Sequence, residues 1–209
     1  MKLCILLPPW RAYICVLKTL LGARMKYLVA CFLTAGAIAL GPASATVSDV
    51  AANGFTLSQT VAVSAPPDRV YAALVEPARW WSSEHTFSGS AANMSLQAQA
   101  GGCFCEKLPG GGSVQHLTVL AVTPGQSLRL AGMLGPFQAV AGNGVMSFTL
   151  IPDKTGTKLE MTYQVAGYAN MKMGGNGYDT WSKAADGMLT GQLQRLKRAV
   201  ETGSPDAKP

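Results

Sequence analysis

The chain has 209 residues, of which 48% are hydrophobic and 13% charged, with 17 basic and 11 acidic side chains. Five of the basic residues and none of the acidic ones lie in the first 45 positions, which leaves 12 basic against 11 acidic residues in the remainder. A domain so close to neutral lacks the basic surface that nucleic acids or anionic membranes attract, so neither is expected as a partner.

The N-terminal segment has the pattern of a secretory signal peptide. A lysine follows Met25, an apolar run spans residues 27–40, and small side chains stand at Ala43 and Ala45. The pattern predicts that residues 1–45 are a leader, with Met25 as the favoured start, cleavage after Ala45 and export to the periplasm or the medium. The apolar run is shorter than the roughly 20 residues that a membrane-spanning helix needs, so the mature protein is expected to lack a stable membrane span.

One domain is expected to account for the rest of the chain. Residues 54–201 have about the length of a domain with one core. The flanking segments 46–53 and 202–209 lack large apolar side chains and are expected to be flexible.

The domain is predicted to contain one strand, two short helices, six further strands and one long helix, in that order. Residues 55–63 alternate apolar and polar side chains, which predicts a half-buried strand. Two prolines then introduce a short helix at 69–75, and a second short helical turn carries Trp80 and Trp81. Gly- and Pro-rich turns separate six further strands, and a long amphipathic helix follows them. The strands are 93–99, 103–108, 114–122, 127–131, 145–151 and 158–165, and the helix is 178–201.

Five short motifs, in this order and spacing, resemble the START-like fold. They are 63–71 (VSAPPDRVY), 79–81 (RWW), 101–106 (GGCFCE), 120–125 (LAVTPG) with 128–130 (LRL), and 156–159 (GTKL). This superfamily, also called SRPBCC, includes the polyketide cyclase/dehydrase proteins, and the chain looks nearest to the C-terminal domain of heat-shock-protein ATPase activators, here in an exported form.

The resemblance implies an α+β helix-grip fold. A curved antiparallel sheet of about seven strands would wrap around the long C-terminal helix, with two short helices after the first strand. It also implies a cavity between the sheet and that helix for an apolar ligand such as a lipid, sterol or polyketide.

Two cysteines remain after the predicted cleavage, and they lie near a histidine. A hairpin closed at residues 109–112 places His116 opposite Cys105, or opposite Glu106 if the register shifts by one residue. Cys103 shares a face with Cys105, because side chains two positions apart in a strand point the same way.

Three hypotheses for this segment stay open. Cys103 and Cys105 can be a structural pair, either bonded in a disulfide or buried as thiols. They can instead bind zinc or copper(I) together with His116, although a fourth ligand is not apparent. The third hypothesis is a redox-active pair or a catalytic site that includes Glu106.

Aromatic and apolar side chains are the candidates for ligand contact. Trp80 and Trp81 can cap the mouth of a cavity, although core packing is the alternative for at least one of them. His85 is expected on an exposed loop. The predicted ligand-binding residues are Trp80, Trp81, Phe87, His116, Phe137, Tyr168, Trp181 and Met188.

The favoured function is an exported, non-enzymatic binding protein for a hydrophobic small molecule. No phosphate-binding loop, nucleophile elbow or dinucleotide motif is present, and the chain has only two histidines. The alternatives are a cyclase, dehydratase or hydrolase that uses the same cavity, and a metal or redox stress protein. No cofactor is expected, except for zinc or copper(I) under the metal hypothesis.

Overall fold

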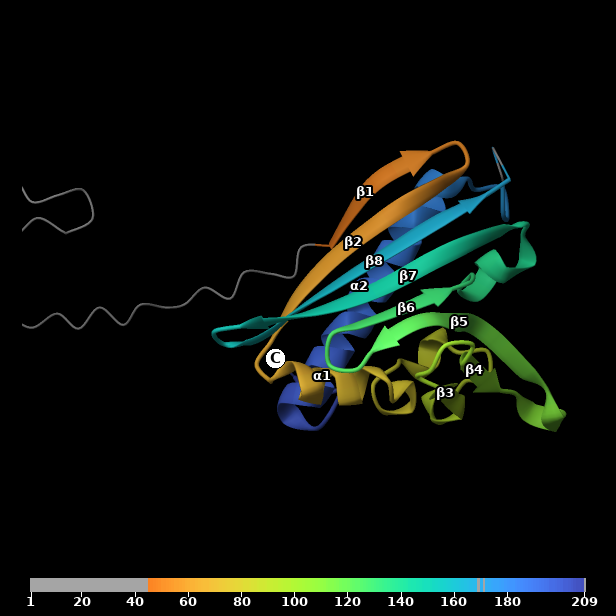
Figure 1. Ribbon diagram of the computed structural model, residues 1–209. Helices are drawn as coiled ribbons and strands as arrows, with labels where there is room; N and C mark the ends of the chain where they lie inside the picture. The colour runs from red at the N-terminus through yellow and green to blue at the C-terminus, as the bar shows by residue number, and fades with distance from the viewer. Residues whose placement is uncertain (1–44, 169, 171, 209) are drawn as a thin grey trace, which may run out of the picture. The chain divides into compact units, whose positions relative to one another are not determined.

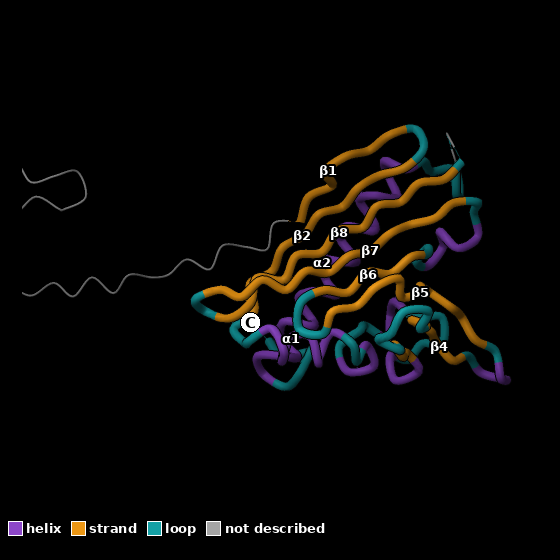
Figure 2. Tube along the Cα trace, in the orientation of Figure 1, coloured by secondary structure: helices purple, strands orange, loops and turns teal. Residues whose placement is uncertain are grey.

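The computed structural model describes residues 45–168, 170 and 172–208. The predicted signal peptide lies outside these residues, apart from Ala45. One antiparallel sheet contains eight strands in the order β1-β2-β8-β7-β6-β5-β4-β3 (Figures 1 and 2). The strands are β1 (Ala45–Ala51), β2 (Gly54–Val63), β3 (Met94–Leu96), β4 (Cys103–Lys107), β5 (Ser113–Thr123), β6 (Ser127–Ala131), β7 (Gly142–Asp153) and β8 (Gly156–Gly167), and the α-helices are α1 (Pro67–Leu74) and α2 (Tyr178–Thr202).

The long helix α2 lies on one face of this sheet. Figure 1 shows it behind the strands, and it packs against β1, β2 and α1. Leu189, Leu193 and Leu196 are buried at helical spacing and form its side of the core. A sheet that is apolar on one face must bury that face, and α2 supplies the cover. The predicted α+β helix-grip fold is confirmed.

The N-terminal flank is a strand and not the flexible segment that was predicted. β1 pairs with β2 from Ala45 opposite Gln59 to Ala51 opposite Gly54. Val47 is half-buried and packs against the core. The prediction failed because it weighed side chains alone, whereas an edge strand is held mainly by backbone hydrogen bonds to its neighbour.

Two further predictions about short segments need correction. Only one short α-helix follows β2, because the turn before the tryptophans is a 3₁₀ helix at Pro77–Arg79. The C-terminal tail is not loose over its described residues. Arg198 donates a hydrogen bond to the Pro205 carbonyl, and Arg195 forms an ion pair with Asp206. These two arginines hold residues 203–206 against α2.

Candidate functional site

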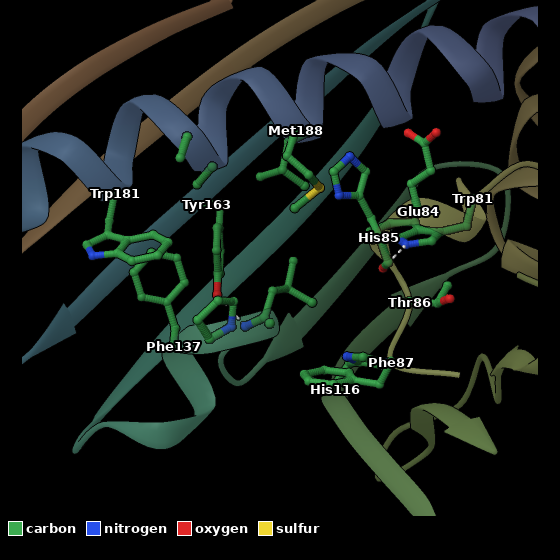
Figure 3. A pocket seen from close by; sticks show the side chains of 16 residues that line it. Trp81, Glu84, His85, Thr86, Phe87, His116, Phe137, Tyr163, Trp181 and Met188 are labelled. Carbon is green, nitrogen blue, oxygen red and sulfur yellow. Dashed lines mark hydrogen bonds between the residues drawn. The ribbon is translucent and has the colours of Figure 1, made fainter. Parts of the chain in front are cut away.

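A cavity of about 360 Å³ lies between α2 and the sheet. α2 approaches β1 and β2 on one flank, and the cavity opens on its other flank, toward β5 and residues 134–137 (Figure 3). Its lining is largely apolar. The lining residues are Trp81, Glu84, His85, Thr86, Phe87, His116, Leu134, Gly135, Pro136, Phe137, Tyr163, Trp181, Ala184, Ala185, Met188 and Leu189.

One end of the cavity is aromatic. The rings of Phe137 and Trp181 meet edge to face with centroids 5.9 Å apart, and Figure 3 shows them side by side. The indole N–H of Trp181 donates to the Met173 carbonyl at 3.2 Å. Phe137 also packs on Phe55 of β2, with centroids 5.7 Å apart. These contacts hold the two rings in place as an apolar wall.

Tyr163 of β8 lies in the middle of the cavity wall. Its hydroxyl accepts a hydrogen bond from the Leu134 amide and donates one to the Gly132 carbonyl, both at 3.2 Å. Burial raises the pKa of Tyr163 to about 12, against a smaller lowering by the Leu134 amide. The hydroxyl therefore stays protonated and supports the loop before residues 135–139 rather than facing a ligand.

The opposite end holds a buried carboxylate and imidazole. Nε2 of His116 lies 3.0 Å from Oε2 of Glu106, and the two side chains are 5% and 0% exposed. Phe87 stacks on the imidazole with ring centroids 5.9 Å apart and an interplanar angle of 26°. Phe104 covers it from another side, with centroids 5.4 Å apart. This is the buried polar end of a cavity whose lining is largely apolar.

A β-bulge aims His116 into the protein. Cys105 lies opposite Gln115, whereas the residue before Cys105 lies opposite Leu117, so His116 is the extra residue of β5 and has no partner. Neither predicted partner of His116, Cys105 or Glu106, is therefore correct, although Phe104 opposite Leu117 and Cys103 opposite Thr118 keep the first predicted register. In a regular strand, consecutive side chains point to opposite faces, so only one of the two faces the core. The bulge allows His116 and Leu117 both to be buried.

The loop that borders this end is tied down at two points. The indole N–H of Trp81 donates to the His85 carbonyl at 3.0 Å, drawn as a dashed line in Figure 3. Oε2 of Glu106 accepts the amide of Phe87 at 3.1 Å, and Oε1 accepts the amide of Ser88. The carboxylate of Glu106 thus orients both the loop and the imidazole.

The hydrogen bonds determine which of the paired groups is charged. Burial by itself raises the pKa of Glu106, but the hydrogen bonds from Ser88, Phe87 and His116 together lower it below its ordinary value. Burial lowers the pKa of His116, and the hydrogen bond and charge of Glu106 only partly offset this. At neutral pH the pair is a carboxylate and a neutral imidazole.

This charge state selects one tautomer of His116. An ionised carboxylate only accepts hydrogen bonds, so Nε2 of His116 must carry the proton that it donates to Glu106. The neutral ring then has a lone pair on Nδ1. Among the described residues, the ring of His116 forms one hydrogen bond, through Nε2 to Glu106, and Nδ1 has no partner. His116 lines the cavity, so Nδ1 is the ring atom left to accept a hydrogen bond from a molecule bound there.

Six of the eight predicted ligand-binding residues line the cavity, and two do not. Trp80 is buried behind Trp81, and its indole N–H donates to the Ala73 carbonyl at 2.9 Å. Tyr168 is 76% exposed and lies outside the lining. The six are Trp81, Phe87, His116, Phe137, Trp181 and Met188.

The structure does not bring the three predicted metal ligands together. Cys103 and Cys105 are bonded to each other in a disulfide, with Cα atoms 5.4 Å apart. Their side chains share the face of β4 opposite to Phe104 and Glu106, which point inward with His116. Within residues 45–168, 170 and 172–208, no group of three His, Cys, Asp or Glu side chains is placed to hold a metal. The bulge is the reason, because it turns His116 away from the cysteines.

Some lining residues were missed by the sequence analysis. Tyr163 occupies an inward position of β8, and its alternation with polar neighbours was the signal that could have identified it. Leu134 and Pro136 lie in a Gly-rich connection with no periodicity, so no local pattern indicated them. His85 is exposed, as expected, and also borders the cavity.

The sequence matches one family model over residues 54–201, described as polyketide cyclase / dehydrase and lipid transport. The chain belongs to this family. The match covers the sheet from β2 onward and both α-helices, which are the elements that enclose the cavity. Membership of the polyketide cyclase / dehydrase family confirms the superfamily resemblance, while the nearer placement beside the ATPase activators stays a prediction. No curated protein matches the sequence significantly.

Solved structures are similar to this chain at low sequence identity. A putative uncharacterized protein from Rhizobium leguminosarum is 18% identical with a TM-score of 0.51, covering 76% of this chain and 97% of its own. Protein CV1439 from Chromobacterium violaceum is 21% identical with a TM-score of 0.47, covering 70% and 96%. The di-domain ARO/CYC BexL from the BE-7585A biosynthetic pathway is 17% identical with a TM-score of 0.49, covering 76% and 52%. At 18% identity, the likeness to the Rhizobium leguminosarum protein supports the fold alone.

The described part of this polyketide cyclase / dehydrase family member includes no helix that is both long and apolar enough to span a membrane.

Proposed function

We propose that the protein is exported and binds a hydrophobic small molecule in the cavity between α2 and the sheet. The observation that carries the proposal is the cavity itself, which has a volume of about 360 Å³ and walls formed mainly by aromatic and aliphatic side chains. Ligand sites are typically concave, largely apolar and equipped with a few polar groups, and the His116–Glu106 end supplies those groups.

The volume narrows the range of ligands. Typical small-molecule sites occupy about 300–1,000 Å³, so this cavity lies near the small end of the range. A compact ring compound is therefore a better fit than a lipid with two acyl chains. The aromatic end formed by Phe137 and Trp181 favours the same choice, because flat rings stack well against aromatic side chains.

Export is the second part of the proposal. It is supported by the charged start, the apolar run and the small residues that precede Thr46. The disulfide between Cys103 and Cys105 is consistent with an oxidising compartment.

Binding of an apolar fluorescent probe tests the function. Met188 borders the cavity from α2, and Met188→Trp places a larger ring in the space that a ligand needs. We expect the affinity for N-phenyl-1-naphthylamine, an uncharged fluorescent probe, to fall by about tenfold, equivalent to about 1.4 kcal/mol. Lys183→Trp, on an exposed position of the same helix, is the matched control and should leave the affinity unchanged. Equal effects of the two variants would refute binding in this cavity.

An enzyme that uses the same cavity is the second candidate, and the His116–Glu106 pair favours it. A neutral imidazole oriented by a carboxylate is a general base of suitable strength near neutral pH. Nitrobenzisoxazole is a test substrate for such a base. The base removes the ring C–H proton, the N–O bond breaks, and a coloured cyanonitrophenolate forms. Turnover that His116→Gln abolishes and Lys183→Trp preserves would support catalysis, and a rate equal to that of free imidazole would refute it.

A further inference from the structure

The two ends of the cavity differ in what they offer a ligand. Figure 3 shows Trp181 and Phe137 at one end, and Phe87 with His116 at the other. The first end presents only ring surfaces, because the one indole N–H there is bonded to the Met173 carbonyl. At the second end, Nδ1 of His116 keeps a free lone pair. A ligand that fills the cavity therefore meets an apolar wall and, across from it, a hydrogen-bond acceptor.

The acceptor is held rigidly. Glu106 accepts hydrogen bonds from the amides of Phe87 and Ser88 as well as from Nε2 of His116. Its own position is therefore determined by the backbone, and it prevents the imidazole from turning over and presenting an N–H instead. Phe87 and Phe104 pack on the ring and keep its plane fixed. A polar atom oriented by such supports is suited to select a ligand and not merely to tolerate one.

The neighbourhood of the acceptor disfavours anions. Glu106 carries a buried negative charge next to the ring, and Glu84 adds a second carboxylate to the cavity lining. Neither Lys nor Arg belongs to the lining residues. A ligand with a carboxylate at this end would meet a lone pair and the negative charge of Glu106, whereas a neutral hydroxyl would donate its hydrogen to Nδ1 of His116.

We propose that the cavity selects uncharged ring compounds that bear a hydroxyl group, with the hydroxyl donating to Nδ1 of His116 and the ring system stacked toward Phe137 and Trp181. This inference rests on the proposed function, binding of a hydrophobic small molecule, and adds the chemical class of that molecule. His116 is the residue that determines specificity. Glu106 is a positioning residue, because it holds the tautomer and does not itself touch the ligand.

Three naphthalenes that differ in one substituent test the inference on the unmodified protein. They are β-naphthol, its methyl ether and β-naphthoate, measured by calorimetry at neutral pH. The methyl ether lacks the donor but retains the ring, so it should bind about three- to tenfold more weakly than the naphthol, as expected for one hydrogen bond. The naphthoate should bind more weakly than both.

Variants test whether His116 is the residue that causes the preference for the naphthol over its ether. His116→Phe retains a ring and removes Nδ1, so the naphthol and its ether should bind to it with equal affinity. Glu84→Gln and His85→Gln alter other polar groups of the lining and should keep the preference for the naphthol. In Glu106→Gln, the proton is no longer held on Nε2 of His116. The preference for the naphthol over its methyl ether should therefore decrease, while the ether should still bind.

A spectroscopic measurement on the unmodified protein avoids the risk that a variant fails to fold. The chain has two histidines, so isotope-labelled histidine gives only two sets of ring nitrogen signals, and His85 serves as the internal reference. We expect His116 to show a protonated Nε2 and a bare Nδ1, with the Nδ1 signal shifting on addition of β-naphthol and not on addition of the ether.

The outcomes separate the inference from the proposed function on which it rests. A protonated Nδ1 on His116, equal affinities for the naphthol and its ether, or tightest binding of the naphthoate would each overturn the inference while leaving apolar binding in place. If none of the three naphthalenes binds and the fluorescent probe does not bind either, the proposed function fails and the inference fails with it.

Discussion

Nε2 of His116 and Oε2 of Glu106 lie 3.0 Å apart in the interior of the protein, and the pair joins three separate segments. Glu106 comes from β4 and His116 from the bulge in β5, while the amides of Phe87 and Ser88 bring the preceding loop to the same carboxylate. The pair is therefore a structural junction as well as the polar end of the cavity. Its protonation and its removal both have measurable consequences.

The first prediction concerns the pH dependence of stability. The pKa of His116 is lowered in the folded protein, chiefly by burial, so the unfolded chain takes up a proton first as the pH falls. The contribution of neutral His116 is complete above its ordinary pKa of about 6.5 and is lost as the pH decreases through the lowered folded value. The loss approaches about 1.4 kcal/mol per pH unit for one proton.

Urea denaturation between about pH 8 and pH 5 measures this effect. The wild-type free energy of unfolding should fall more steeply below about pH 6.5 than that of His116→Gln. His85→Gln, which changes the other histidine, is the control and should follow the wild-type curve. Parallel curves for wild type and His116→Gln would show that His116 is not buried in its neutral form.

The second prediction concerns the carboxylate. Glu106→Gln keeps the size of the side chain but removes the charge that accepts hydrogen bonds from His116, Phe87 and Ser88. We expect the free energy of unfolding to decrease by about 2–3 kcal/mol, because hydrogen bonds to a buried charge are among the strong ones. Glu84→Gln, at an exposed position, should change it by no more than about 0.5 kcal/mol. Similar losses in the two variants would contradict the role of Glu106 as a junction.

The third prediction concerns the disulfide. The bond joins residues only two positions apart and closes a very short loop, so replacing Cys103 and Cys105 by alanine should cost at most about 2 kcal/mol. Intact-mass measurement with and without a reductant checks that the bond is present. Because His116 points to the other face of the hairpin, His116→Ala should not weaken any zinc or copper(I) binding by the reduced protein. A metal affinity that decreases in His116→Ala would instead support a metal site formed by Cys103, Cys105 and His116.

The fourth prediction concerns processing. Cleavage after Ala45 would remove only the first residue of β1 and leave Thr46 as the mature N-terminus. N-terminal sequencing of the exported protein should begin at Thr46, and Ala45→Leu should block cleavage because the site requires a small side chain. A different first residue, or retention of the protein inside the cell, would count against the export proposal.

The order of the strands from β2 to β8 and the position of α2 were predictable from the sequence, with approximate limits. The strand predicted at 127–131 is β6, and the long helix begins at Tyr178 as predicted. Such elements are encoded locally, because alternation marks a strand, helical spacing marks α2, and Gly and Pro end both. The spacing of Trp181 and Met188 along α2 likewise indicated two residues that border the cavity.

The chemistry of the site depends on contacts between distant segments, which the sequence did not reveal. The residues around His116 allow two regular registers with β4. The fold keeps one of them only for Phe104 opposite Leu117 and Cys103 opposite Thr118, because the bulge buries His116 and Leu117 together and brings the imidazole to Glu106. The same carboxylate accepts hydrogen bonds from two backbone amides of a loop that lies about 20 residues earlier in the chain. A bulge and a buried hydrogen-bond network depend on contacts between distant segments, and no local pattern in the sequence records the free energy of those contacts.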